Sequence, residues 1–146
     1  MHTIYEILRQ KGPHFNYIEA SAFVIDALTL MKCENISYLI VLEDGNYAGV
    51  ISERDYAQKV ILMAKHSDAT MVKEIMTTDL PIVSETDTVE QCMILMNASK
   101  SRYLPVFDGF DFKGIITIHD LMRETIAENQ NLKNAPDKKP SRHYWV

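Results

Sequence analysis

A seven-residue pattern whose residue types suit a small anionic ligand occurs twice in this sequence. Residues 49–55 read Gly-Val-Ile-Ser-Glu-Arg-Asp, and residues 114–120 read Gly-Ile-Ile-Thr-Ile-His-Asp. If each stretch ends a strand and begins a helix, its hydroxyl and the first N–H groups of the helix can donate to a phosphate. The glycine lets a ligand or a neighbouring backbone approach closely, and the aspartate can accept from two adjacent hydroxyls. A phosphate together with a vicinal diol indicates a nucleotide.

The same residues also have an interpretation that needs no ligand. Ser52 with Asp55, and Thr117 with Asp120, match a capping box, in which the side chains satisfy the first N–H groups of a helix and contribute about 1 kcal/mol. One copy alone would favour the cap. Two copies in the same context favour a ligand site, and the two roles can coexist.

One offset of 65 residues aligns the two motifs and most of the surrounding chain. Upstream, apolar residues spaced i, i+3, i+4 and i+7 predict a helix in each copy, beginning near Ser21 and near residues 86–87. These residues are Val24, Ala27, Leu28 and Met31 in the first copy, and Val89, Cys92, Met93 and Met96 in the second. Between helix and motif, two β-rich runs around an Asp-Gly pair predict a hairpin, with the second turn one residue earlier than the first.

Each copy therefore reads as a strand, a helix, a hairpin and a helix. The expected fold class is α+β (α/β), with two tandem βαββα repeats packed through their sheets into one pseudo-twofold module. A copy of about 55 residues buries only about 60% of its unfolded surface, so the pair should be the folding unit. The predicted parts are an N-terminal helix and lead-in at 1–15, a first repeat at 16–67, a linker at 68–79, a second repeat at 80–130 and a flexible tail at 131–146.

Composition narrows the function classes. The chain has 146 residues, a net charge of −5 and two cysteines, with no basic and apolar leader at its start. These features predict a soluble, cytoplasmic protein without a disulfide framework or a metal site, and they disfavour a membrane or nucleic-acid partner. We find no Ser-His-Asp order, HExxH motif or P-loop, so the sequence predicts neither catalytic residues nor a catalytic cofactor.

Both copies resemble CBS repeats, and together residues 16–130 resemble the paired CBS unit called a Bateman module. Residues 52–56, followed by 74–77, are also similar to small bacterial and organellar proteins that consist of little else. The resemblance implies a non-enzymatic regulatory module that binds AMP, ADP, ATP, NAD or S-adenosylmethionine in the cleft between the repeats. It also implies a flat homodimer and an energy or redox sensor that acts on a partner in trans. A ligand-free dimerisation scaffold remains the alternative.

Carried over by position, the resemblance implies that Asp55 and Asp120 hold ribose hydroxyls, while Ser52 and Thr117 lie near phosphate, beside Gly49 and Gly114. The adenine would be enclosed by residues of the first strands and the hairpins, namely Ile18, Tyr38, Leu39, Ile40, Val83, Tyr103, Leu104 and Pro105. Arg54, Lys59 and Arg102 are expected phosphate partners or else solvated side chains. His119 stands where the first copy has Arg54, and it is either a weak phosphate donor or a partly exposed structural histidine.

Overall fold

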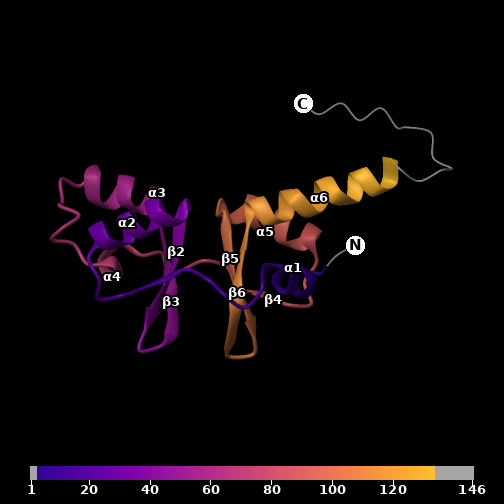
Figure 1. Cartoon of the computed structure of the whole chain (residues 1–146), viewed down its shortest axis with the longest axis horizontal. Helices are drawn as coiled ribbons and strands as arrows, with labels where there is room; N and C mark the ends of the chain where they lie inside the picture. The colour runs from indigo at the N-terminus through magenta and orange to yellow at the C-terminus, as the bar shows by residue number, and fades with distance from the viewer. Residues whose placement is uncertain (1–2, 134–146) are drawn as a thin grey trace.

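The computed structural model describes residues 3–133, which form two similar halves that lie side by side (Figure 1). The first half contains β1 (Tyr17–Glu19), α2 (Val24–Glu34), β2 (Tyr38–Glu43), β3 (Asn46–Ser52), α3 (Glu53–Tyr56), the π-helix η1 (Ala57–Ile61) and α4 (Val72–Ile75). The second half contains β4 (Val83–Ser84), α5 (Val89–Ser99), β5 (Tyr103–Asp108), β6 (Asp111–Thr117) and α6 (Ile118–Lys133), and α1 (Ile4–Lys11) packs beside it. None of the described helices is long and apolar enough to span a membrane.

Each half contains one three-stranded sheet, and the two sheets have the same topology. Their strand orders are β1-β2-β3 and β4-β5-β6, with the first strand parallel to the middle one and the hairpin antiparallel. Ile18 pairs with Val41, and Val83 pairs with Val106, at positions related by the sequence offset. The predicted α+β fold with two tandem βαββα repeats is confirmed.

Two local details differ from the sequence predictions. Both hairpins turn at the same position of the repeat, because the first residue of each turn, Asp44 or Gly109, takes up the left-handed conformation. The prediction of an earlier second turn was therefore wrong, and only the glycine is displaced. The helix starts also lie later than expected. Phe23 precedes α2 without a side-chain cap, and Thr88 forms a capping box with Gln91 at α5.

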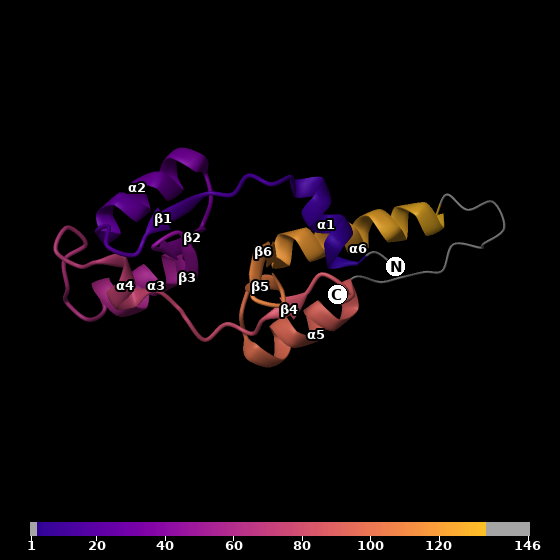
Figure 2. The same ribbon diagram turned by 90° about the horizontal axis from the view of Figure 1, so that it is seen from below.

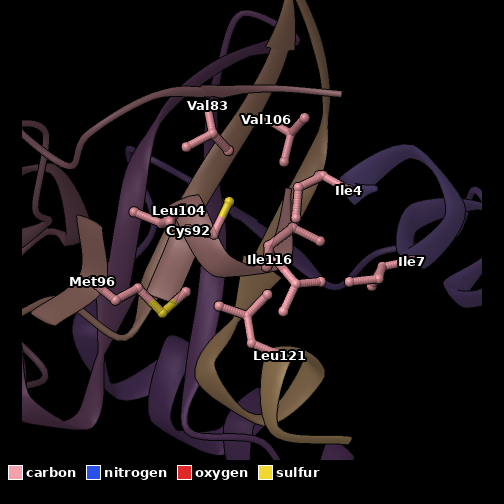
Figure 3. Packing of buried hydrophobic residues seen from close by; sticks show 10 residues of the cluster. Ile4, Ile7, Val83, Cys92, Met96, Leu104, Val106, Ile116 and Leu121 are labelled. Atoms are coloured by element: carbon pink, nitrogen blue, oxygen red, sulfur yellow. The ribbon is translucent and has the colours of Figure 1, made fainter. Parts of the chain in front are cut away.

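Each repeat has a hydrophobic core. Each core also contains residues of the helix that precedes the other repeat in sequence. Ile4 and Ile7 of α1 lie in the second core with Ile116 and Leu121 (Figure 3). Val72 and Ile75 of α4 lie in the first core. Residues 68–79, predicted as a linker, thus include a helix that completes the first repeat. Figure 2 shows α1 in the half that contains β4, β5 and β6, and α4 in the half that contains β1, β2 and β3.

A third apolar cluster joins the two sheets. Ile40, Val50 and Ile115 are buried in it, and aromatic side chains from both hairpins surround them. The rings of Tyr47 and Phe112 stack with their centroids 4.8 Å apart. Because this cluster removes apolar surface of both sheets from water, the repeats form one folded unit. The predicted tail at 131–146 falls largely outside the described residues, although α6 continues to Lys133.

Candidate ligand-binding cavities

Each duplicated motif forms a strand-to-helix corner, and its aspartate caps the helix that follows. The Asp55 carboxylate accepts from Ser52 N at 2.9 Å, and Asp55 N donates to Ser52 Oγ at 3.3 Å. The Asp120 carboxylate accepts from Thr117 N at 2.9 Å, and Asp120 N donates to Thr117 Oγ1 at 3.2 Å. The capping interpretation of the motif is therefore correct at both corners, whether or not a ligand also binds there.

The other Asp55 oxygen is bonded to donors of its own repeat. Asp55 Oδ1 lies 2.8 Å from Thr77 Oγ1 and 2.9 Å from Lys59 Nζ, and the side chain is only 7% exposed. Lys59 also donates to the Ile75 carbonyl at 2.9 Å. This lysine, expected to meet phosphate, instead holds the aspartate and the end of α4 together.

Asp120 is bonded to a residue from the far end of the chain. Lys11, the last residue of α1, donates to Asp120 Oδ2 at 2.8 Å and to the Ile115 carbonyl at 2.9 Å, and Arg123 pairs with Oδ1. Burial alone would raise the pKa of Asp120, but the hydrogen bond and charge of Lys11, with the bonds from Thr117, hold that pKa below its ordinary value. The sequence motif gave no indication of Lys11 or Arg123.

The two motif glycines accommodate neighbouring protein. A Cβ at Gly49 would lie 2.6 Å from the Thr77 carbonyl oxygen, and Thr77 exchanges backbone hydrogen bonds with Val50. Gly114 has φ +144°, and its Cβ would lie 3.1 Å from Leu8 Cδ2 of α1. The sequence allowed either a ligand or a neighbouring segment to approach these glycines closely. In the structure, neighbouring segments do so.

Cavities border both corners in the part of the chain that the structure describes. The first cavity, about 510 Å³, is lined by Ser37, residues 52–55, Thr77, residues 79–81 and residues 99–103. The second cavity, about 650 Å³, is lined by Lys11, Leu28, Met31, Lys32, residues 35–38, Glu53, Tyr103, Thr117, His119, Asp120 and Arg123. The third cavity, about 170 Å³, is lined by Leu8, residues 11–16, Ile36, Tyr38, Ile40 and residues 113–115. The first two have the size of cavities that hold small ligands.

The cavities follow the pseudo-twofold symmetry of the chain. The first cavity combines Asp55 with the segment before β5, and the second combines Asp120 with the segment before β2. Residues 79–81 line the first cavity, and their counterparts at the 65-residue offset, residues 14–16, line the third. Our sequence reasoning missed these two segments, although each lies within two residues of a strand that it had identified.

The residues expected around adenine divide between cavities and cores. Tyr38 and Tyr103 line the cavities, with ring centroids 4.6 Å apart, and Ile40 borders the third cavity. Burial, then nearby Asp120 and Tyr103, raise the pKa of Tyr38 to about 12, so its hydroxyl is protonated at neutral pH. The others pack inside the protein: Leu39, Leu104 and Val83 lie in the repeat cores, Ile18 packs against the first core, and Pro105 is buried in β5.

Several of the residues expected near phosphate line the cavities. Arg54 and Arg102 line the first cavity, and His119 lines the second. The first N–H group of each helix, which the sequence offered to an anion, already donates to protein. Glu53 N bonds to the Ser37 carbonyl at 3.0 Å, and Ile118 N bonds to the Arg102 carbonyl at 2.9 Å. Side chains therefore supply most of the positive charge available at these corners.

Comparison with known proteins agrees with the repeat and its corners. The model of the CBS domain family matches residues 6–61 and again residues 72–127. The chain belongs to the CBS-domain family. The first match begins within α1, and the second begins at the start of α4. CBS-domain proteins are regulatory modules that commonly bind adenosine ligands and often oligomerise.

Several relatives match over most of this chain. A solved CBS-domain protein from Burkholderia ambifaria MC40-6 is 34% identical, with a TM-score of 0.81, over 97% of this chain and 100% of that one. The CBS domain-containing protein CBSX3, mitochondrial, from Arabidopsis thaliana is 28% identical over 137 residues, and an uncharacterized 33.4 kDa protein from Thermofilum pendens is 30% identical over 132 residues. The chain covers 66% and 43% of the lengths of these two relatives.

Proposed function

We propose that this CBS-domain protein is a non-catalytic module that binds an adenine nucleotide or related ligand in the cavities between its repeats. The candidates are AMP, ADP, ATP, NAD and S-adenosylmethionine. One observation carries the proposal: in each repeat, a buried corner aspartate borders a cavity whose opposite wall comes from the other repeat. A ligand there contacts both repeats at once, so its binding energy can change their arrangement.

Binding requires the ribose hydroxyls to take over part of the hydrogen bonding at each carboxylate. At Asp55 they would replace Thr77 or Lys59, and at Asp120 they would replace Lys11 or Arg123. The capping bonds from Ser52 and Thr117 can remain. Because each new hydrogen bond to ribose replaces an existing one, its net contribution to the binding free energy is reduced. The affinity therefore depends also on the contacts of base and phosphate.

Isothermal titration calorimetry with AMP, ATP, NAD and S-adenosylmethionine tests the ribose assignment directly. We expect Asp55→Ala and Asp120→Ala each to weaken binding at their own cavity by about 1.5 to 3 kcal/mol, or about 10- to 150-fold. Asp79→Ala, which removes a carboxylate that lines the first cavity away from the corner, is the control and should have a smaller effect. Unchanged affinity in both corner variants would refute the assignment.

We further propose that the module acts as an energy or redox sensor on a separate protein partner, as a homodimer in the cytoplasm. The free thiols of Cys33 and Cys92 suit a reducing compartment. Exposed apolar side chains on the second repeat support self-association, with Ile94 64% exposed on α5 and Ile126 49% exposed on α6.

A ligand-free scaffold is the second candidate, and the corners themselves favour it. Both carboxylates already have protein donors on each oxygen, which is the arrangement expected of caps that serve only stability. A thermal-shift panel separates the two candidates. A nucleotide at about 100 times its Kd should add about 2.7 kcal/mol of stability. If no adenine compound changes the melting temperature, the scaffold interpretation is correct.

A further inference from the structure

The first and second cavities differ in the balance of their charged side chains. In the first cavity, cations and carboxylates are equal in number: Arg54, Lys100 and Arg102 face Glu53, Asp55 and Asp79. In the second, the cations are in excess: Lys11, Lys32 and Arg123 face Glu53 and Asp120. The second cavity is also the larger of the two.

The lysines that pair with the two aspartates are placed differently. Lys59 pairs with Asp55 but is directed toward the Ile75 carbonyl, and it is not among the residues that line the first cavity. Lys11 pairs with Asp120 at 2.8 Å and lines both the second and the third cavity. Its side chain is 31% exposed, so its ammonium group can leave the carboxylate without crossing the protein interior.

Resting on the proposed function, we propose that the second cavity selects nucleoside di- and triphosphates, that the first accepts monophosphates, and that Lys11 determines this difference. When ribose hydroxyls take over Asp120 Oδ2, the Lys11 ammonium is released to pair with the phosphate chain. AMP carries about two negative charges, and each further phosphate adds to that charge. A cavity with excess cations therefore gains more from ATP than a cavity whose charges balance.

Variants with one intact corner separate the two cavities. Asp55→Ala leaves the second corner intact, and Asp120→Ala leaves the first. Titrations with adenosine, AMP and ATP without Mg²⁺ give the ratio of the AMP Kd to the ATP Kd for each. We expect this ratio to be at least about 10 in Asp55→Ala and close to 1 in Asp120→Ala. Equal ratios in the two variants would overturn the inference.

Lys11 is then tested in the variant that keeps only the second corner. Adding Lys11→Met to Asp55→Ala should weaken ATP binding by about tenfold. Adenosine should bind as well as before or more tightly, because the Lys11 ammonium no longer competes with its ribose for Asp120. Lys11→Arg, which keeps the charge, should retain the ATP preference. The matched control adds Lys59→Met to Asp120→Ala, and it should leave the ratio at the first cavity unchanged.

The outcomes separate failure of this inference from failure of the proposed function. If the wild-type protein binds no adenine nucleotide, both fall. If nucleotides bind but Lys11→Met leaves the ratio of AMP to ATP affinity unchanged, only the selectivity assigned to Lys11 is refuted. Circular dichroism of each variant checks that the repeats remain folded, and retained adenosine binding shows that the second cavity is intact.

Discussion

At the scale of single residues, Asp55 and Asp120 play the same part with different partners. Each forms a capping box with the hydroxyl residue three positions before it, Ser52 or Thr117. Their charges are then balanced differently. Lys59 comes from the same helical segment as Asp55, whereas Lys11 is 109 residues away from Asp120. Two equal motifs thus have unequal electrostatic surroundings.

The lowered pKa of Asp120 predicts a loss of stability in acid. Because the folded pKa lies below the unfolded value, the ionised carboxylate stabilises the fold above the unfolded pKa, and this stabilisation disappears as the pH falls through the folded pKa. Urea unfolding free energies of wild type and Asp120→Asn should therefore differ near pH 6, and this difference should shrink steadily as the pH is lowered below about 4. The exposed Asp68→Asn serves as the control. A constant difference between wild type and Asp120→Asn across this range would contradict the prediction.

At the scale of elements, the helices that precede the repeats each contribute buried residues to a core. α1 buries Ile4 and Ile7 in the second core, and its Leu8 approaches Gly114. The backbone of residues 4–5 also donates to carbonyls of Asp87 and Glu85. α1 therefore belongs to the second repeat by contact, although it lies before the first repeat in sequence.

Ile7→Ala tests the contribution of α1. The Ile7 side chain is 5% exposed, so its truncation leaves a cavity in the second core and should cost about 2 to 5 kcal/mol of unfolding free energy. Tyr5, on the same helix, is 52% exposed, and Tyr5→Ala should cost about 0.5 kcal/mol or less. Urea denaturation measures both. Similar costs for the two variants would mean that α1 does not complete the core in solution.

At the scale of the whole molecule, the two repeats are joined by an apolar cluster and leave apolar side chains on their helices. Ile61 of η1 and Ile126 of α6 occupy equivalent positions and are 56% and 49% exposed. Met93 and Ile94 extend the exposed surface along α5. Such a surface on both repeats suits association with a second copy.

We predict that Ile94→Glu combined with Ile126→Glu converts the proposed dimer to a monomer, because each change places a charge in the apolar contact. Phe110 is also fully exposed, but it lies at the tip of the second hairpin, so Phe110→Glu should leave the assembly unchanged. Size-exclusion chromatography with light scattering gives the mass of each. A monomeric wild type, or a dimer that survives the double change, would refute this interface.

The sequence alone determined the features that depend on local pattern and on the repeat. Periodicity predicted the helices, residue types predicted the hairpins, and the spacing of Ser52 from Asp55 predicted the caps. Alternation along β2 could also have told which hairpin side chains face a cavity. Tyr38 and Ile40 lie on the side of the contact between repeats, and Leu39 lies on the core side, because neighbouring residues of a strand point to opposite faces.

Only the tertiary structure decided which residues distant in sequence meet the two aspartates. Lys11 reaches Asp120 because α1 packs on the second repeat, and Thr77 reaches Asp55 because the chain after α4 runs beside Gly49. Neither contact could be predicted from the spacing of residues in the sequence, because each depends on packing between segments that are distant in the chain. The pattern of residues therefore defined the two corners, while long-range packing decided their charge and the shape of the cavities beside them.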